Sequence, residues 1–357
     1  MGGDGKVEAL LRQWGGENVV VRYDQQTGAW LFIAIHSTLA GPAAGGTRMK
    51  VYPDWTAGLQ DALRLAEAMT WKLAIPQIPN GGGKAVIALP EGFDPAERDG
   101  LLRRYGSLVA QLRGSFLTGP DVGTSAQDMD IIAATAGNYV AAGDSSAHAG
   151  FFTALGVFTG IEVVCQRLFG SSDLKGRKVL VQGAGSVGGA LIGRLLSAGA
   201  QVLFTEVDAQ AVRRVASEWP TAGFIPPAEA YATHCDIFSP CSLGGVLNQG
   251  TIPQLACRAV VGGANNQLAE PDAINLLQQR NILYVPDYVV NIGGAMAVGG
   301  LEECGWTLAQ TTENVSGHVR QALQRLLDLA AEEAIPTPAA ALRIAQQSLA
   351  SLPPRDA

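Results

Sequence analysis

Two lysines carry the sharpest chemical signal in the sequence. Lys72 ends a segment with helical periodicity, and Lys84 follows three glycines at the start of an apolar run, in the stretch IPNGGGKAVIALP over residues 78–90. The intervening segment is long enough to fold back, so both ammonium groups could meet in one pocket. A lysine beside a second cation in a dry cleft loses proton affinity and can act as a base near neutral pH. A solvated lysine at the edge of a glycine-rich loop is the competing interpretation.

The glycines before Lys84 also fit a ligand site. Glycine has no Cβ, so it leaves room for a ligand to come close, and it permits positive φ. The uniformly apolar run that follows predicts a strand over 84–89, with Lys84 at the point where burial begins. This apolar run weighs against a solvated lysine.

Three further polar residues are candidates for the same chemistry. Asp121 follows Gly-Pro on a predicted tight turn after a short strand, where an ordinary turn aspartate is the alternative. Asn265 in GGANNQL and Asn291 in PDYVVNIGGA stand beside glycines at predicted strand ends. Ligands bind outside the carboxyl ends of parallel strands, so each asparagine is either a turn former or a partner for a substrate.

A second set of glycines has the spacing of a dinucleotide site. The segment KVLVQGAGSVGGALIGRLLSAGAQVLFTEVD holds Gly183-x-Gly185-x-x-Gly188 between a predicted strand and a predicted helix, and Glu206 stands 18 residues after Gly188. The first glycine permits the turn, the second lets pyrophosphate approach the helix N-terminus, and the third lets helix and strand pack. The Glu206 carboxylate would bind ribose hydroxyls and repel a 2′-phosphate, which predicts NAD over NADP. A tight turn that binds nothing is the alternative.

The elements that must position the lysines and Asp121 follow from periodicity and turn residues. The pattern predicts a hairpin over 19–38, an amphipathic helix over 57–71, and a helix that Asp94-Pro95 opens and Gly114 ends. SAQD over 125–128 is a variant capping box that opens another helix. The small, polar segment AAGDSSAHAG over 141–150 predicts a domain joint.

The second half of the chain alternates strands and helices. Strands are predicted at 178–182, 201–206, 235–240, 258–264 and 282–286. This alternation predicts an α/β fold with a parallel, doubly wound sheet. The last helices, roughly 308–350, could pack back on either domain.

Composition narrows the class of protein. A length of 357 residues predicts two domains, and a net charge of −7 without a block of like charge argues against a nucleic-acid partner. No window of about 18 uncharged apolar residues and no signal peptide are recognised, which predicts a cytoplasmic protein without a membrane span. The five cysteines are scattered, as expected for reduced thiols, and the four histidines lack ligand spacing, which predicts no metal site.

Eight segments, in order along nearly the whole chain, resemble the Glu/Leu/Phe/Val dehydrogenase family, and the length is similar to its leucine/phenylalanine/valine branch. They are GPAAGGTRM (41–49), MTWK (69–72), GGGKAVIALP (81–90), TGPDVGTSAQDMD (118–130), VQGAGSVGG (181–189), CDIFSPCSLGG (235–245), GGANNQL (262–268) and ILYVPDYVVNIGGA (282–295). The resemblance implies a substrate-binding and oligomerisation domain over 1–145 and a Rossmann-type NAD-binding domain over 146–329, with a cleft between them. It also implies a C-terminal helix over 330–357 that packs back on the first domain.

The resemblance further implies a reaction and a set of roles. An L-amino acid, NAD⁺ and water would give a 2-oxo acid, ammonium and NADH, reversibly, through an iminium and a carbinolamine. Lys84 would be the base that activates water, Asp121 would move protons at the substrate nitrogen, and Lys72 would bind the substrate carboxylate. The remaining substrate contacts would come from Gly45, Gly46, Met69, Gly119, Asn265 and Asn291.

The cofactor contacts are implied in the same way. Thr153 would lie near the nicotinamide carboxamide. The other contacts would come from Gly183, Ala184, Gly185, Ser186, Val187, Gly188, Glu206, Cys241, Ser242 and Asn265. Closure of the cleft would exclude water from the hydride step. The family forms homo-oligomers, dimers or larger, mostly through the N-terminal domain.

The choice of substrate rests on a few positions. No cation beyond Lys72 is evident for a second acid group, so an apolar amino acid is the default substrate. Gly119 stands where leucine-type relatives often have Ala, and a smaller wall favours a larger side chain, which favours phenylalanine and leaves leucine and valine open. Gly263 and Ile292 each replace the family's usual Ala, and Ile292 adds bulk beside Asn291.

Two other functions stay open at this point. A dehydrogenase of another small acid would need a histidine in a suitable motif, and none of the four histidines has one. A non-catalytic, NAD-binding regulatory protein would tolerate damage to the lysine pair, yet Lys72 and Lys84 are both present.

Overall fold

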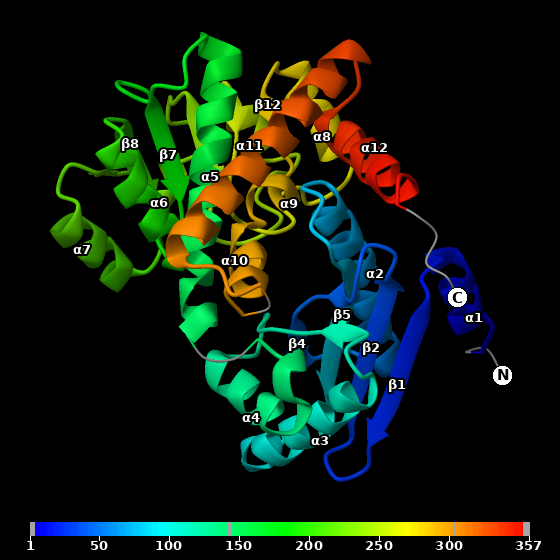
Figure 1. Ribbon diagram of the computed structural model, residues 1–357. Helices are drawn as coiled ribbons and strands as arrows, with labels where there is room; N and C mark the ends of the chain where they lie inside the picture. Colours follow the sequence, from blue (N-terminus) through cyan, green and yellow to red (C-terminus); the bar gives the residue numbers. More distant parts are fainter. Residues whose placement is uncertain (1–3, 142–143, 303, 353–357) are drawn as a thin grey trace. The chain divides into compact units, whose positions relative to one another are not determined.

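The computed structural model describes residues 4–141, 144–302 and 304–352 (Figure 1). The chain divides into two compact units. The first holds Met1–Ala147 and Ile344–Ala357, and the second holds His148–Arg343. The divisions fall inside two helices, α5 (Asp144–Phe169) and α12 (Thr337–Ala350). Residues 142–143 of the predicted joint lie outside the described part of the chain.

The first unit is built round a mixed six-stranded sheet in the order β1-β2-β5-β3-β6, with β4 also paired to β5. The β1–β2 and β2–β5 pairs are antiparallel, and the β3–β5, β4–β5 and β3–β6 pairs are parallel. The predicted hairpin is thereby confirmed as β1 and β2. The strands are β1 (Asn18–Asp24), β2 (Ala29–Ser37), β3 (Ala43–Ala44), β4 (Thr47–Val51), β5 (Gly81–Leu89) and β6 (Phe116–Leu117).

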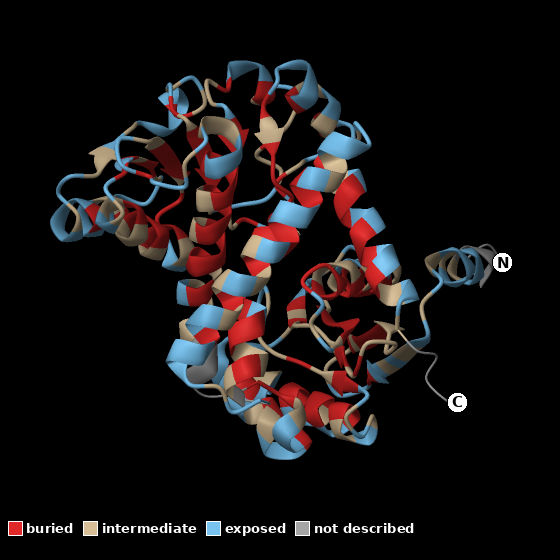
Figure 2. Cartoon of the chain, turned by 45° about the horizontal axis from the view of Figure 1, so that its top comes forward, coloured by how far each residue is buried: buried red, intermediate tan, exposed pale blue. Residues whose placement is uncertain are grey.

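Helices cover both faces of this sheet, and the buried residues in Figure 2 lie in the strands and on the helix sides that face them. The predicted amphipathic helix forms α2, which packs Leu59 and Leu63 against Phe32 and Val86 on one face. α3 and α4 cover the other face. The helices are α1 (Asp4–Trp14), α2 (Trp55–Ala74), α3 (Arg98–Gln111) and α4 (Ala126–Ala136).

Local signals place most of these elements correctly, with two corrections. The predicted capping box of α4 is present, because Ser125 and Asp128 each bind the other's backbone N–H. The strand predicted from residue 84 begins three residues earlier, at Gly81. Asp94 accepts the N–H of Ala96 and so caps a 3₁₀ turn, Pro95–Glu97, which precedes α3.

The second unit holds a six-stranded sheet in the order β12-β11-β10-β7-β8-β9, with every pair parallel. This confirms the predicted parallel, doubly wound sheet. The strand order reverses direction between β7 and β10, which is where such sheets bind ligands. The strands are β7 (Lys178–Gln182), β8 (Gln201–Thr205), β9 (Gly223–Phe224), β10 (Ile237–Pro240), β11 (Ala259–Val260) and β12 (Leu283–Tyr284).

Side chains cap two helices of this unit, and the capping residues are Asp208 and Thr307. Asp208 accepts the N–H of Gln210 at the start of α7, and Thr307 with Gln310 forms a capping box on α11. β11 and β12 are shorter than predicted, since only two residues of each pair with a neighbour. The helices are α6 (Ser186–Ser197), α7 (Ala209–Glu218), α8 (Ala273–Gln279), α9 (Asp287–Val290), α10 (Gly293–Glu302) and α11 (Leu308–Glu332), besides α5 and α12.

The long apolar helix α5 bears on the predicted absence of a membrane span. In the described part of the chain, one stretch, His148–Phe169, is long and apolar enough to cross a membrane by length and composition alone. Of the window that meets this test, 61% is buried inside the protein. The core helix of a globular domain meets the same test, so this single stretch is weak evidence for a span.

Candidate active site

Lys84 lies where the sheet of the first unit is interrupted. β3 and β4 pair with the same edge of β5, and Gly45 and Gly46 between them belong to neither strand. Both glycines are needed for this close approach. A Cβ on Gly45 would lie 1.8 Å from the carbonyl oxygen of Gly83, and a Cβ on Gly46 would lie 2.9 Å from the Cβ of Asp121. The interruption therefore brings the Asp121 turn next to Lys84.

The three glycines before Lys84 serve packing inside a strand. Gly81–Gly83 form the first part of β5, and none of them adopts the positive φ that glycine permits. A Cβ on Gly82 would lie 2.1 Å from the backbone nitrogen of Thr70, so the glycine lets α2 approach the strand. The glycines thus hold α2 against the start of β5 and allow Lys84 to be buried.

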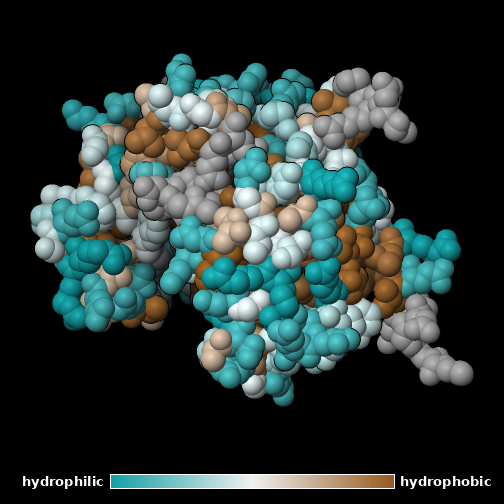
Figure 3. Space-filling view, turned by 60° about the horizontal axis from the view of Figure 1, so that its bottom comes forward, coloured by the Kyte–Doolittle hydropathy of each residue, from teal (hydrophilic) through white to brown (hydrophobic). Residues whose placement is uncertain are grey.

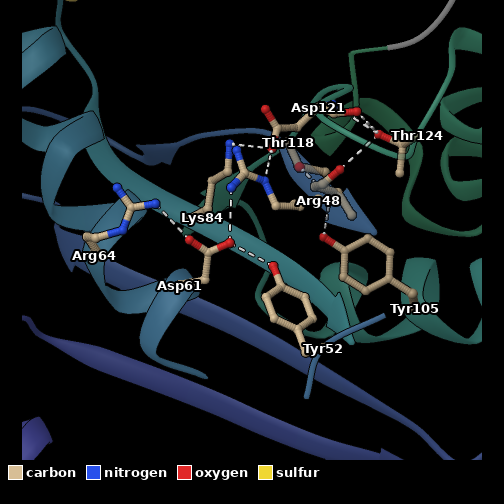
Figure 4. A network of polar contacts seen from close by, with 10 residues as sticks. Arg48, Tyr52, Asp61, Arg64, Lys84, Tyr105, Thr118, Asp121 and Thr124 are labelled. Carbon is tan, nitrogen blue, oxygen red and sulfur yellow. Dashed lines mark hydrogen bonds and ion pairs between the residues drawn. The ribbon is translucent and has the colours of Figure 1, made fainter. Parts of the chain in front are cut away.

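Three side chains meet at one carboxylate oxygen (Figure 4). The Lys84 Nζ atom, from β5, lies 3.2 Å from Oδ2 of Asp121. The Nε atom of Arg48, from β4, donates to the same oxygen at 2.8 Å. The Lys84 side chain is 7% exposed and the Asp121 side chain 19%. This is a nearly dry cluster of two cations and a carboxylate.

Burial and charge move the pKa values of this cluster in useful directions. Burial lowers the pKa of Lys84, the Asp121 carboxylate opposes that effect, and the positive charge of Arg48 adds to it. At Asp121 burial alone would raise the pKa, but the charges of Lys84 and Arg48 outweigh burial and hold the pKa below its ordinary value. The site can therefore hold a neutral amine next to an ionised carboxylate.

Arg48 and the residues that hold it are not evident as site residues from the sequence. The Nη1 atom of Arg48 donates to Oδ2 of Asp61 at 3.0 Å, and that oxygen also accepts the Tyr52 hydroxyl at 2.7 Å. The Nη2 atom of Arg64 reaches the other oxygen of Asp61 at 2.8 Å. The only sequence signal was the place of Arg48 two residues after Gly46 in GPAAGGTRM.

Hydrogen bonds to β4 fix the turn that carries Asp121. The Thr124 hydroxyl accepts the N–H of Asp121 at 2.9 Å and donates to the carbonyl of Thr47 at 2.8 Å. The N–H of Thr47 donates to the carbonyl of Gly119 at 2.8 Å. A Cβ on Gly119 would lie 3.4 Å from the Cβ of Ala141, an ordinary contact, so the backbone there does not require glycine.

The other predicted residues of the first unit lie on α2. Met69 and Lys72 are half-buried in its last turns. Thr70, between them, packs against Gly82 at the start of β5. The end of α2 that carries Lys72 thus lies against the beginning of the strand that carries Lys84.

The glycine motif of the second unit has the geometry of an anion cradle. Gly183 has a φ of +92°, and a Cβ on it would lie 2.6 Å from the Cβ of Ser242. A Cβ on Gly188 would lie 1.9 Å from the carbonyl oxygen of Gly183. Among the described residues, nothing lies within 4 Å of a Cβ on Gly185, and no side chain caps α6, which begins at Ser186. Open space and free backbone N–H groups at a helix N-terminus fit a phosphate.

Glu206 lies at the end of β8 and is bound to the same turn. Its carboxylate accepts backbone N–H groups from Ala184 at 2.7 Å, Val207 at 2.6 Å and Asp208 at 3.1 Å. Burial favours the neutral acid, but these hydrogen bonds outweigh it and lower the pKa of Glu206. The Arg214 guanidinium donates to the carbonyl of Ala184 at 2.6 Å.

Further predicted cofactor residues surround the motif. A Cβ on Gly263 would lie 2.8 Å from Cγ1 of Val187 and 3.7 Å from Cγ2 of Thr153. The glycine at 263 therefore lets the loop after β11 approach both side chains. The Cβ of Cys241 lies 3.3 Å from the position of a Cβ on Gly188.

The two candidate asparagines form a pair. The Asn291 Nδ2 group donates to Oδ1 of Asn265 at 2.9 Å and to the carbonyl of Gly263 at 3.3 Å. The Oδ1 atom of Asn291 is buried and accepts no hydrogen bond from the residues that the structure describes. A buried acceptor without a donor is costly, so this atom is suited to receive an N–H or O–H of a ligand. Ile292 is fully buried in the core.

The described residues hold no group of three or more His, Cys, Asp or Glu side chains that could bind a metal ion. The five cysteines are free thiols. Burial raises the pKa of Cys165 to about 11, which keeps that thiol protonated and weakly nucleophilic.

The family to which the chain belongs is shown by comparison with known proteins. The model of the Glu/Leu/Phe/Val dehydrogenase dimerisation domain matches residues 18–138. The Glutamate/Leucine/Phenylalanine/Valine dehydrogenase model matches residues 202–353. The resemblance seen in the sequence is thereby confirmed.

Individual relatives agree with these matches. Leucine dehydrogenase of Bacillus cereus is 36% identical over 345 residues, which are 96% of this chain and 93% of that protein. Valine dehydrogenase of Streptomyces coelicolor is 40% identical over 353 residues, covering 96% and 94%. The structure of L-tryptophan dehydrogenase from Nostoc punctiforme matches with a TM-score of 0.84 and 36% identity, covering 96% of this chain and 98% of that one. The chain therefore belongs to the Glu/Leu/Phe/Val dehydrogenase family and is an oxidoreductase that acts on the CH–NH₂ group of amino acids.

Proposed function

We propose that this enzyme catalyses the reversible, NAD-dependent oxidative deamination of an apolar L-amino acid to the 2-oxo acid and ammonium. The observation that carries the proposal is the buried pair of Lys84 Nζ and Asp121 Oδ2, 3.2 Å apart. Burial lowers the pKa of Lys84, while the permanent charge of Arg48 favours the ionised form of Asp121. A base that loses its proton easily and a charged carboxylate are the two groups that this reaction needs.

Each residue of the pair has a proton to move. Asp121 accepts a proton from the substrate ammonium, which frees the nitrogen lone pair to assist departure of hydride from Cα. When bound, the nicotinamide ring supplies the acceptor for that hydride. Lys84 accepts a proton from the water that adds to the iminium carbon. Asp121 then returns its proton to the nitrogen, the C–N bond breaks to release ammonia, and the hydroxyl proton of the carbinolamine passes to solvent.

The substrate carboxylate and nitrogen need further partners. We assign the carboxylate to Lys72, because it lies in the turn of α2 next to the start of β5. We assign the substrate nitrogen to Asn291, because its unpaired Oδ1 atom can only accept a hydrogen bond. Asn265, whose Oδ1 atom already receives Asn291, orients that amide.

The residues of the second unit fit a nicotinamide dinucleotide. The uncapped N-terminus of α6 and the open space at Gly185 suit the pyrophosphate. The ionised Glu206 at the end of β8 suits the ribose hydroxyls and disfavours a 2′-phosphate, which supports NAD. Thr153 and Val187, with Cys241, would contact the rest of the cofactor.

One observation favours NADP as the second candidate cofactor. The Arg214 guanidinium lies at the motif, 2.6 Å from the carbonyl of Ala184, and an arginine near the ribose is the usual partner of a 2′-phosphate. The Arg214 contact is to a carbonyl, whereas Glu206 is itself a charge that a phosphate must approach. We therefore place NAD first.

The preferred substrate is an apolar amino acid, with phenylalanine first and leucine or valine next. Gly119 stands on the strand side of the Asp121 turn, and nothing in the backbone requires glycine there, so its missing methyl enlarges the local space. One methyl group changes selectivity only about 10–200-fold, which leaves several side chains as usable substrates. The relatives named for leucine, valine and tryptophan support this class.

The experiment is a direct assay of reduction of NAD⁺ and NADP⁺ with L-Phe, L-Leu, L-Val and L-Trp, and of ammonium-dependent oxidation of NADH with the matching 2-oxo acids. We expect activity with NAD⁺ and at least one of the four, and loss of turnover in Lys84→Ala with NADH binding retained. Absence of activity with all four while NADH still binds would contradict the proposal and favour a regulatory protein. Turnover retained in Lys84→Ala would contradict the assigned base.

We further propose that the enzyme is a cytoplasmic homo-oligomer. Its subunits contact one another through the first unit, where the family's dimerisation-domain model matches. β1 is an edge strand, and its Val21 and Tyr23 side chains are 46% and 49% exposed. Figure 3 shows hydrophobic side chains gathered to the right of the centre, on the side where Figure 1 draws β1. Apolar side chains on an open strand edge favour pairing with another chain. Light scattering after size-exclusion chromatography tests this, and a monomer at micromolar concentration would contradict it.

A further inference from the structure

Arg48 stands between the proton-transfer pair and a second, buried carboxylate. Its side chain is 15% exposed, and its fork reaches Asp121 with Nε at 2.8 Å and Asp61 with Nη1 at 3.0 Å. The three residues come from β4, from the turn after β6 and from α2 (Figure 4). A guanidinium with two carboxylates in a rigid fork is held more firmly than a lysine could be.

Asp61 is itself fixed from the far side. Tyr52 donates to its Oδ2 atom at 2.7 Å, and Arg64 donates to its Oδ1 atom at 2.8 Å. The Arg64 side chain is 57% exposed, so solvent screens it, whereas the Arg48 side chain is only 15% exposed. Asp61 therefore anchors Arg48, and Arg48 in turn anchors Asp121.

The contacts at Asp121 are unequal. Its Oδ2 atom accepts both Arg48 and Lys84, and no hydrogen bond from the described residues reaches its Oδ1 atom. Oδ1 is thus the oxygen left to exchange a proton with the substrate nitrogen. Rotation of the carboxylate would break both contacts at Oδ2.

We propose that Arg48 is the positioning residue of the proton-transfer pair: anchored by Asp61, it fixes the Asp121 carboxylate and keeps a permanent positive charge beside Lys84. The inference rests on the proposed function of Lys84 and Asp121 and adds a residue to it. Because a guanidinium does not titrate in this range, the charge is constant across the working pH.

The groups around Lys84 give the expected direction of each effect. The charges that act on Lys84 are those of Asp121, Arg48 and Asp61, and β2 places Ala34 opposite Lys84. Tyr52 and Arg64 bind Asp61. The charge of Arg48 lowers the pKa of Lys84, and the charge of Asp61 raises it. The two anchoring residues therefore act on the base with opposite signs.

The test compares the pH dependence of kcat/KM in Arg48→Gln and Asp61→Asn. The fall of kcat/KM on the acid side of the profile, its acid limb, reports the pKa of the base in the free enzyme. We expect Arg48→Gln to move this limb to higher pH by about one unit or more and to lower the rate at neutral pH about tenfold or more, because a nearby like charge is removed. We expect Asp61→Asn to move the limb to lower pH. A purely structural role would lower the rate by one factor at all pH values in both variants.

Two more variants separate charge from geometry. Arg48→Lys keeps the charge but cannot span both carboxylates, so the limb should stay within a few tenths of a unit while kcat falls. Arg12→Gln is the control, because the Arg12 side chain is 79% exposed and binds Glu8, outside this network. Its pH profile should match that of the unaltered enzyme. Thermal unfolding of every variant shows which of them are folded.

A readout independent of turnover completes the test. Competitive labelling of lysines with acetic anhydride, resolved by mass spectrometry, gives the titration of Lys84 directly. If the unaltered enzyme oxidises no amino acid, the proposed function fails, and the opposite shifts of Lys84 in Arg48→Gln and Asp61→Asn still decide this inference. Equal profiles and equal labelling in the two variants would overturn it. If Arg48→Gln does not fold, the other two variants still test the inference. It then requires a lower kcat with an unchanged acid limb in Arg48→Lys and a shift of the limb to lower pH in Asp61→Asn.

Discussion

The replacement Lys84→Met separates the chemical role of the lysine from its cost to stability. Methionine is similar in length and fits a site that is 7% exposed, but it carries no charge and no basic nitrogen. Asp121 keeps its 2.8 Å hydrogen bond from Arg48, so the carboxylate stays paired. Two consequences can therefore be measured on one variant.

The first consequence is a loss of turnover. A positioned general base contributes about 10²–10⁴-fold in rate, so kcat should fall by about that factor. Cofactor affinity should stay the same, because Lys84 belongs to the first unit and the dinucleotide motif to the second. Amino-acid oxidation and fluorescence titration with NADH measure the two quantities. Lys175→Met, at an exposed residue, is the control for loss of a lysine.

The second consequence is a change in how stability depends on pH. Burial depresses the pKa of Lys84 in the folded state below its value in the unfolded chain. Between these two values the unfolded chain binds more protons, so the free energy of unfolding of the unaltered enzyme rises with pH. The slope is at most about 1.4 kcal/mol per pH unit for one proton. The loss of stability caused by burial of the protonated amine is complete below the pKa of Lys84 in the folded state. It vanishes above about 10.4, the pKa of lysine in the unfolded chain.

Urea unfolding of both proteins at several pH values isolates this effect. The free energy of unfolding of the unaltered enzyme minus that of Lys84→Met should rise with pH across the alkaline range. Lost packing changes this difference by the same amount at every pH, and other groups titrate alike in both proteins. The slope of the difference against pH therefore reports the titration of Lys84 alone. A difference that is flat or falls as pH rises would show that burial does not favour the neutral amine, and the reasoning about Lys84 would be refuted.

Two further changes test the packing and the cofactor site. Gly82→Ala places a Cβ 2.1 Å from the Thr70 backbone, which cannot yield like a side chain, so we expect a loss of about 2–3 kcal/mol or more in the free energy of unfolding; an unchanged urea midpoint would contradict the packing argument. Glu206→Gln removes the charge at the ribose site and should raise the NADP⁺ to NAD⁺ ratio of kcat/KM about tenfold, whereas an unchanged ratio would show that Glu206 does not select the cofactor.

The sequence predicts the architecture well where the signal is local. The hairpin of β1 and β2, the capping box at Ser125 and the strand–glycine–helix order around Gly183 each depend on neighbouring residues, and each appears in the structure. The lengths of β11 and β12 were overestimated, because an apolar run shows burial but does not show how many of its residues find a pairing partner.

The glycines before Lys84 show what sequence reasoning cannot reach. Their number and place predict a special backbone, but the reason lies in tertiary partners: Thr70 approaches Gly82, and Phe116 approaches Gly83. A sequence alone does not distinguish a glycine needed for positive φ from one needed for close packing. Only the partner positions show that these residues form a strand.

Arg48 was missed for a related reason. Its residue type fits a solvated surface, and its importance depends on the register that sets β4 beside β5 and on the Gly45–Gly46 interruption that brings the Asp121 turn close. Neither is visible in a linear pattern. The motif GPAAGGTRM contains Arg48, but the sequence does not show that its side chain binds two carboxylates.

The role proposed for Arg48 resolves a conflict that burial creates. The site needs Lys84 neutral and Asp121 charged, but removal of water favours the neutral form of both groups. Burial alone would therefore neutralise the carboxylate together with the amine. A fixed cation next to both has opposite effects on them, because it favours the ionised carboxylate and disfavours the protonated amine. Asp61 balances the charge of Arg48, so the site holds a permanent cation without leaving it unpaired.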